Sequence, residues 1–282
     1  MTRLIFLLIP FVLASCAQMH PVLQTTLNKT LHHIDIAALE FDDKLKIRRL
    51  TPLTMMLGST GLMIDNIMVE AQGYEYAKKV GDVGLECGKV FKSTLIHRLK
   101  ESGYVVHDRN ERYWDYFKAS RKSIRDQTDA ILRINMEQVG FWAGGLTRPY
   151  RASALIRVEM VAAQGREVLY RNRFVIGLSP KDVRILKDYI GTTELVERGK
   201  LSPTFKNFKT LLANGSESRF DLLNVMALAA RKIATDLKPK EERDLLAVEY
   251  TSPNTTPRGD WNHGGLNPSG SSNASTLDLS GS

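Results

Sequence analysis

Two neighbouring segments, 153–161 and 167–176, alternate between apolar and polar residues. Strict alternation is typical of a strand with one buried face. The apolar sets are Ala154, Ile156, Val158 and Met160 in the first segment and Val168, Tyr170, Phe174 and Ile176 in the second. A three-residue connection, Ala163-Gln164-Gly165, puts both sets on the same face, because a shift by one residue would invert one of them. The pattern predicts a half-buried antiparallel hairpin.

Helical periodicity and turn residues divide the rest of 31–250 into further elements. Apolar residues recur three and four positions apart in 83–102, which predicts a helix, and Gly103 stands where a left-handed C-cap residue is needed. We also expect strands at 32–41, 104–106 and 130–141, and helices at 114–126, 181–190, 203–213 and 217–237. The sequence therefore predicts an α/β (α+β) two-layer domain, with a mixed or antiparallel sheet of four to five strands and helices packed on one face.

The other face of the hairpin is charged, and on it we expect cross-strand ion pairs on a solvated surface. Its residues are Arg157, Glu159, Glu167, Arg171 and Arg173. Glu137 and Glu159 also form the kind of acidic pair that a glycan hydrolase needs. Both lie among arginines in the sequence, which favours ion pairing over catalysis.

The amino end carries one cation, Arg3, and then the apolar run Leu4–Leu13. A bilayer span takes about 20 apolar residues, so the run is typical of a secretory signal peptide rather than an anchor. The following Leu13-Ala14-Ser15-Cys16 resembles the lipobox of bacterial lipoproteins. That resemblance implies cleavage between Ser15 and Cys16, and a diacylglycerol thioether on the Cys16 thiol. The alternative is that Cys16 is an incidental residue beyond an ordinary secretory cleavage site.

Lipidation would hold the mature chain to a lipid bilayer through acylated Cys16, since two or three acyl chains anchor stably where one does not. Ala17, where sorting to the inner membrane would use Asp, favours the outer membrane by the same resemblance. The expected organisation is a signal peptide at 1–15, a lipidated tether at 16–30 with a reach of about 20 Å, a single α/β domain at 31–250 and a disordered polar tail at 251–282.

The composition excludes several kinds of site. Two cysteines, Cys16 and Cys87, cannot build a disulfide scaffold or a four-cysteine zinc site. Cys87 falls on the apolar stripe of the helix at 83–102, where a buried inert thiol is expected. The six histidines have no metal-ligand spacing, and no catalytic or nucleotide-binding motif occurs in the sequence. We therefore expect neither a cofactor nor a metal.

The chain is basic, with a formal net charge of +8. Its basic runs would suggest nucleic acid inside a cell, but an exported chain rarely meets it, so no nucleic-acid partner is expected. Anionic headgroups or glycans are the functional alternative to simple solubility.

The segment 53–71 is apolar on nearly all sides of a helix. Two interpretations stay open: a helix within the core, which we favour, or an apolar surface for a partner. The candidate surface comprises Met56, Leu57, Met63, Ile64 and Met68.

Together these features predict a non-enzymatic lipoprotein at the periplasmic face of the outer membrane, which binds another envelope protein. The hairpin also loosely resembles small α/β domains of periplasmic lipoproteins that assist envelope assembly. The rival hypothesis is a cell-wall glycan hydrolase with an unidentified acidic pair. The oligomeric state is left open by the sequence.

Overall fold

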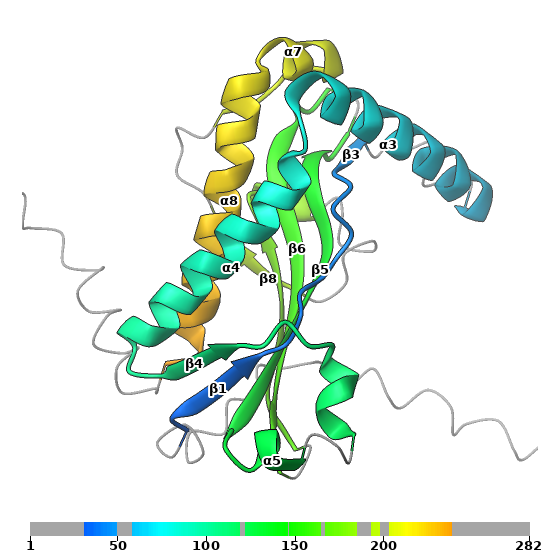
Figure 1. Ribbon diagram of the computed structural model, residues 1–282. Coiled ribbons are helices and arrows are strands. Elements are labelled where there is room, and N and C mark those ends of the chain that lie inside the picture. The colour runs from blue at the N-terminus through cyan, green and yellow to red at the C-terminus, as the bar shows by residue number, and fades with distance from the viewer. Residues whose placement is uncertain are drawn as a thin grey trace, which may run out of the picture. The chain divides into compact units, whose positions relative to one another are not determined.

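The structure is a computed structural model that describes residues 31–49, 58–118, 122–145, 147–164, 167–184, 193–197 and 203–238, with the backbone alone at 58–64. All of these belong to one compact unit (Figure 1). The expected signal peptide (1–15), tether (16–30) and tail (251–282) lie outside the described residues.

The described residues form a mixed sheet of eight strands, so the expected number of four to five is wrong. The main order is β4-β1-β5-β6-β7-β8, and β2 and β3 also pair with β5. The strands are β1 (His33–Ile36), β2 (Glu40–Phe41), β3 (Lys46–Arg49), β4 (Val105–Asp108), β5 (Ala130–Ala143), β6 (Arg151–Ala162), β7 (Val168–Ile176) and β8 (Glu194–Val196). The missed strands have two to four residues, too few to carry a recognisable alternation.

β5 is the longest of these strands and pairs with four others. Along one edge it pairs in parallel with β1, β2 and β3 in turn, and along the other it pairs with β6 in antiparallel. The strand expected at 32–41 is thus divided between β1 and β2. At Gly140 (φ 153°) a Cβ would lie 2.1 Å from the Lys46 carbonyl oxygen, so the close pairing of β3 with β5 requires glycine there.

The hairpin is confirmed as β6 and β7, with Ile156 opposite Phe174 and Ala154 opposite Ile176. Its register shifts between Met160 and Val161. The shift places Val168 with Val161 on the other face, so the prediction that Val168 shares a face with Tyr170 is wrong. A β-bulge inverts the facing of the residues beyond it. Gly165, expected in the connecting loop, lies outside the described residues.

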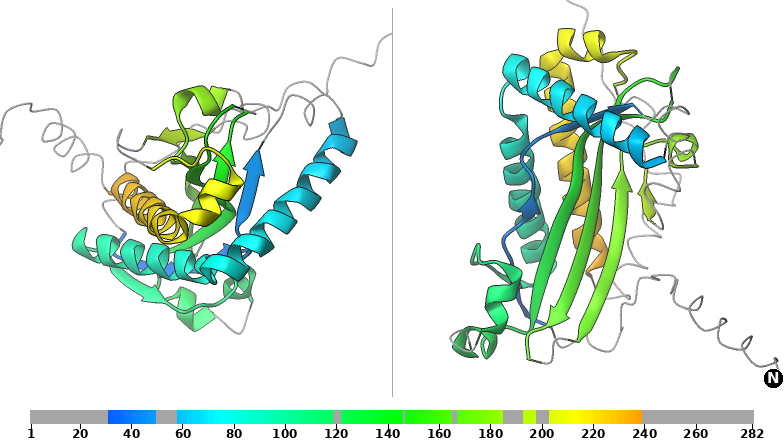
Figure 2. Two further views of the ribbon diagram at one scale, coloured as in Figure 1. Left: turned by 90° about the horizontal axis from the view of Figure 1, so that it is seen from above. Right: turned by 90° about the vertical axis from the view of Figure 1, so that its right-hand side faces the viewer.

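Two long helices, α4 (Val83–Glu101) and α8 (Gly215–Asp236), lie side by side on one face of the sheet (Figures 1 and 2). α4 confirms the expected helix at 83–102. The Asp82 side chain accepts a hydrogen bond from Leu85 N at its start, and Gly103 (φ 85°) follows its end. The helix expected at 114–126 is instead a short 3₁₀ helix, η1 (Tyr113–Phe117), and one turn, α5 (Lys122–Arg125). The remaining helices are α3 (Gly58–Val80) and α7 (Phe208–Ala213).

The two faces of the sheet differ in composition. On the face covered by α4 and α8, buried side chains such as Ile134, Ile156 and Phe174 form one large apolar core with both helices. On the second face, the alternate residues of the same strands pack with residues from neighbouring segments in two smaller apolar clusters. One is built around Trp142, Leu155, Val175 and Leu178, and the other around Tyr113, Tyr116, Ile131 and Val161.

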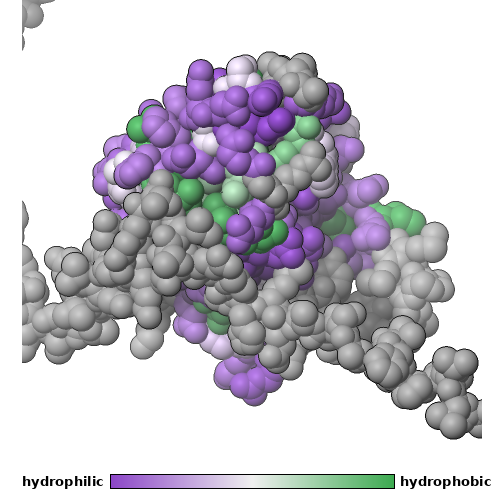
Figure 3. Space-filling view, turned by 90° about the horizontal axis from the view of Figure 1, so that it is seen from below, coloured by the Kyte–Doolittle hydropathy of each residue, from purple (hydrophilic) through white to green (hydrophobic). Residues whose placement is uncertain are grey.

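Charged residues lie between these two clusters. We call this second face of the sheet, which α4 and α8 do not cover, its open face. Seen from below, the described surface of the molecule is also mostly hydrophilic, with small apolar areas between polar side chains (Figure 3). On the open face, polar side chains from several strands come together.

Candidate functional site on the open face of the sheet

Eight polar residues on four strands form what we call the arginine network. They are Glu40 on β2, Arg133, Asn135 and Glu137 on β5, Arg157 and Glu159 on β6, and Arg171 and Arg173 on β7. The strand register sets two rows, because Glu159 lies opposite both Arg133 and Arg171, and Arg157 lies opposite both Asn135 and Arg173. Pairing across strands thus brings residues that are up to 95 positions apart in the chain within contact distance.

Both acidic residues at the centre of the network are bound by two arginines. Glu159 Oε1 accepts a hydrogen bond from Arg171 Nη2 at 2.5 Å, and its Oε2 lies 3.8 Å from Arg133 Nη1. Glu137 Oε1 is 2.7 Å from Arg157 Nη2, while Oε2 accepts from Arg173. Each carboxylate therefore has both oxygens engaged.

Glu40 on β2 lies at one end of the network. Arg133 donates to its two carboxylate oxygens at 2.7 and 2.9 Å, and Asn135 Nδ2 donates at 3.2 Å. The bidentate hydrogen bonds to Glu40 raise the pKa of Arg133, although partial burial opposes them. Arg133 is consequently a fixed cation on this face.

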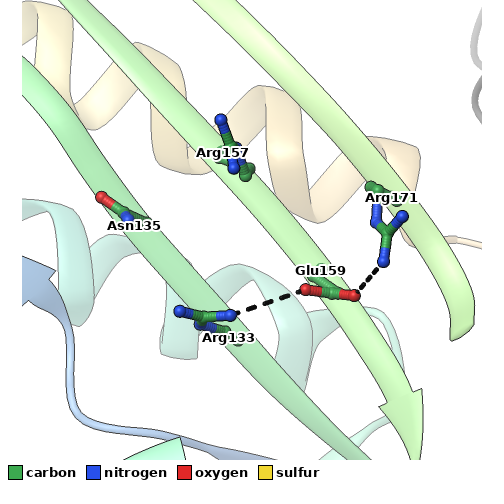
Figure 4. A pocket seen from close by; sticks show the side chains of 5 residues that line it. All are labelled: Arg133, Asn135, Arg157, Glu159 and Arg171. Atoms are coloured by element: carbon green, nitrogen blue, oxygen red, sulfur yellow. Dashed lines mark hydrogen bonds and ion pairs between the residues drawn. The ribbon is translucent and has the colours of Figure 1, made fainter. Parts of the chain in front are cut away.

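A pocket of about 260 Å³ opens between the two rows of the network (Figure 4). It is lined by Arg133, Asn135, Arg157, Glu159 and Arg171. Arg157 approaches Glu137, and Arg171 approaches Glu159, most closely through Nη2. A guanidinium carries five N–H donors, so both arginines keep donors for a ligand. The Arg157 side chain is 50% exposed and the Arg171 side chain 38%, which makes these donors accessible.

An exposed aromatic side chain, Trp114, contacts Arg133, one of the residues that line this pocket. The Arg133 guanidinium carbon is 5.4 Å from the centre of the Trp114 ring and 5.0 Å from that of Tyr113. Trp114 is nevertheless 66% exposed. Such cation–π contacts orient a guanidinium and an aromatic ring against each other.

The sequence anticipated part of this arrangement. The expected ion pairing on the hairpin is confirmed for Arg157, Glu159, Arg171 and Arg173. Sequence reasoning missed Glu40 and Trp114. Glu40 belongs to a two-residue strand, and Trp114 belongs to a 3₁₀ turn that brings it to Arg133. Neither the two-residue strand nor the 3₁₀ turn is visible in the periodicity of the sequence.

The other candidate residues lie elsewhere. Ser15, Cys16, Met56 and Leu57 are outside the described residues, and Met63 and Ile64 lie in α3, where only the backbone is described. Met68 and its neighbour Ile67 are 55% and 67% exposed, so the interpretation of the segment as core is wrong for these two residues.

The orientation of α3 explains that exposure. Its buried side carries Asp65, Val69 and Tyr76. Arg48 on β3 forms an ion pair with Asp65 at 2.9 Å and donates to Asn66 Oδ1 at 2.8 Å. Because this polar contact faces the sheet, Ile67 and Met68 point away from it.

A further polar group joins α8 to the edge of the sheet. Lys232 Nζ lies 2.6 Å from Asp236 and 2.7 Å from Glu194 on β8. Burial would lower the pKa of Lys232, but the hydrogen bonds to these two carboxylates outweigh it and raise the pKa. These charges pair with one another, so the group attaches α8 to β8 rather than offering a binding site.

The described part of the chain contains no group of three or more His, Cys, Asp or Glu side chains that could hold a metal ion. Over the same residues, no helix has the length and apolar content that crossing a membrane would require.

Cys87 lies on the buried side of α4 with Phe91 and Leu95. Burial raises the pKa of its thiol from 9.0 to about 12, and the neighbouring Glu86 acts in the same direction. In a Cys16→Ser chain, which keeps only this thiol, we expect no alkylation of the native protein at about pH 8 and full alkylation in urea. Rapid labelling without denaturant would contradict this burial.

The same pKa implies a loss of stability in alkali. Above the unfolded pKa near 9.0 the unfolded chain releases the thiol proton while the folded chain keeps it, so the free energy of unfolding falls as the pH rises toward about 12. Urea titrations at about pH 8 and about pH 10 measure this decline. The decline in the free energy of unfolding should be smaller in Cys87→Ala. Part of it remains in both chains, because burial also raises the pKa of Tyr76 to about 12.

No protein-family model and no curated protein sequence matches the chain. Solved structures with some likeness include a Xanthomonas campestris protein of the DUF330 family (7% identity, TM-score 0.38, 77% of this chain and 88% of that one). A lipoprotein from Neisseria meningitidis matches with 12% identity, a TM-score of 0.25, and 56% and 94% coverage. A Helicobacter pylori homologue of the neuraminyllactose-binding haemagglutinin matches with 10% identity, a TM-score of 0.30, and 78% and 91% coverage. Likenesses of this degree leave the family and the function of the chain open.

Proposed function

We propose that this chain is a lipoprotein of the bacterial envelope, anchored through acylated Cys16 at the periplasmic face of the outer membrane, and that its α/β domain binds another envelope component without catalysing a reaction. The location rests on Leu13-Ala14-Ser15-Cys16 directly after a short apolar run. The binding role rests on the arginine network, which presents accessible guanidinium donors on the open face of the sheet.

The alternative of a glycan hydrolase has less support from the site. A hydrolase needs one carboxyl group that donates a proton and a second that acts as base or nucleophile. Glu137 and Glu159 are the acidic residues on the open face of β5 and β6, and arginines engage both oxygens of each. This arrangement suits fixed charges that position a ligand.

The anchor is tested by replacing Cys16 with Ser in cells fed radiolabelled palmitate. We expect the variant to lose the label completely and to accumulate as an uncleaved or soluble precursor, since the serine hydroxyl does not accept the lipid. Cys87→Ser is the matched control and should keep both the label and membrane partition. Unchanged membrane partition of Cys16→Ser would contradict the anchor.

The binding role is tested with the purified full chain on peptidoglycan sacculi. We expect no release of soluble fragments from wild type, Glu137→Gln or Glu159→Gln. Fragment release by wild type that either substitution abolishes would instead establish the hydrolase. A partner crosslinked to the wild-type chain in intact cells should be lost on Arg157→Gln if the open face binds it.

A further inference from the structure

We propose that the pocket between the two rows of the arginine network binds an acidic saccharide, that is, a sugar bearing a carboxylate or phosphate group. This inference rests on the proposed binding role of the open face and names the chemistry that the face would recognise. Two independent features carry it: the mixed polar lining of the pocket and the exposed indole of Trp114, which contacts the lining residue Arg133.

The lining contains more positive than negative charge. The residues that line the pocket include Arg133, Arg157 and Arg171 and one carboxylate, Glu159. Arg133 and Arg157 also pair with Glu40 and Glu137, so the whole network of four arginines and three glutamates keeps one positive charge. Arg157 and Arg171 approach their carboxylate partners most closely through Nη2. The N–H groups of a planar guanidinium match the spacing of two oxygens on a carboxylate or phosphate. The excess of cationic donors therefore selects a ligand with an acidic group.

The lining also contains acceptors, and these argue against a bare inorganic anion. Glu159 lies between Arg133 and Arg171, where a phosphate ion would meet a like charge, and Asn135 also lines the pocket (Figure 4). Sugar hydroxyls donate as well as accept, so a saccharide can satisfy Glu159 and Asn135 while its acidic group meets Arg157 and Arg171. Donors and acceptors in one pocket are characteristic of sites for neutral polar groups next to a charged one.

Trp114 supplies the apolar surface that a sugar ring needs. One side of its indole meets the Arg133 guanidinium, 5.4 Å from the ring centre, and the side chain remains 66% exposed. Tyr and Trp are enriched at binding interfaces, because they combine a large apolar ring with a polar O–H or N–H group. Arg133 links this indole to the pocket, so both surfaces can contact one ligand.

The test is calorimetric titration of the full chain in a zwitterionic detergent. The probes are N-acetylmuramic acid, glucose 1-phosphate, neutral N-acetylglucosamine and inorganic phosphate. We expect both acidic sugars to bind at least about tenfold more tightly than the neutral sugar and the phosphate ion, a difference of about 1.4 kcal/mol. Comparison of the two acidic sugars identifies which acidic group is preferred.

Three variants locate the binding. Arg157→Gln and Arg171→Gln should each weaken acidic-sugar binding about tenfold, as expected for the loss of a charge-assisted hydrogen bond, and Trp114→Ala should weaken both acidic and neutral sugars. Arg98→Gln is the matched control, because it removes an exposed arginine whose partner, Glu101, lies on α4. It should leave every affinity unchanged. Thermal unfolding of each variant verifies that it is folded.

Several results would overturn the saccharide site. These are equal affinity for acidic and neutral sugars, binding of inorganic phosphate as tight as that of glucose 1-phosphate, an equal loss in Arg98→Gln, or no binding up to about 10 mM ligand. Monosaccharides have no bond for a hydrolase to cut, so the titration is independent of the sacculus assay. A failure of the anchor test at Cys16 likewise leaves this result unaffected.

Discussion

Replacing Arg48 with Ala should lower the free energy of unfolding by about 3–5 kcal/mol, because it leaves the Asp65 carboxylate buried without its partner. The side chains of Arg48 and Asp65 are 6% and 5% exposed and their charged atoms are 2.9 Å apart. Burial lowers the pKa of Arg48 and raises that of Asp65, so in each case desolvation outweighs the attraction between them. Urea unfolding followed by circular dichroism measures the loss.

The matched control is Lys46→Ala, which breaks an ion pair with Asp42 whose side chain is 54% exposed. We expect a loss of less than about 1 kcal/mol there. Replacing both members of the buried pair, as Arg48→Met with Asp65→Leu, should recover most of the stability, since apolar residues carry no desolvation cost. A single Arg48→Ala loss no larger than that of Lys46→Ala would show that the pair is solvated.

Gly84→Ala should destabilise the protein by about 3 kcal/mol or more, beyond the usual cost of an inserted methyl group. A Cβ at this position would lie 1.6 Å from the Asp43 carbonyl oxygen. Backbone atoms cannot turn aside as a flexible side chain can, so either α4 or the chain between β2 and β3 must move. Both segments contribute to the main core.

Gly88→Ala, one turn later in α4, is the control for this substitution. Its Cβ would be 3.5 Å from the nearest atom of Phe41, an ordinary contact distance. Alanine favours helix over glycine, so Gly88→Ala should raise the free energy of unfolding by about 0.5–1 kcal/mol. Urea unfolding of the two variants therefore separates close packing at Gly84 from helix propensity. A Gly84→Ala variant as stable as Gly88→Ala would contradict the close contact between α4 and the Asp43 carbonyl oxygen.

Long periodic elements were predictable from the sequence, whereas short ones were not. α4, β5 and the β6–β7 hairpin each repeat their pattern often enough for one period to dominate. β2 and β3 contain two and four residues and owe their conformation to pairing with β5. Their stability comes from contacts distant in sequence, which local periodicity does not record.

The position of α3 shows a different limit. The hydrophobicity of 53–71 left both a core helix and a partner surface open, and favoured the core. Asp65 occupies the buried side of α3 because it pairs with Arg48. A buried ion pair depends on the spatial meeting of two residues 17 positions apart, one on a strand and one on a helix. The arginine network was foreseen only in part. Glu159 and Arg171 pair within the predicted hairpin, whereas Glu40 joins from a short strand distant in sequence.

The pairing of β7 has a consequence for copies of this protein at high local concentration. β8 pairs only with Phe174–Ile176, so among the described residues the first part of β7 has β6 as its sole strand neighbour. Bare backbone along a strand invites another chain to extend the sheet. Arg171 and Arg173 stand on this stretch, each in an ion pair with a carboxylate of another strand. Charged side chains on a strand edge disfavour its pairing with a second molecule, because that pairing would disturb their contacts.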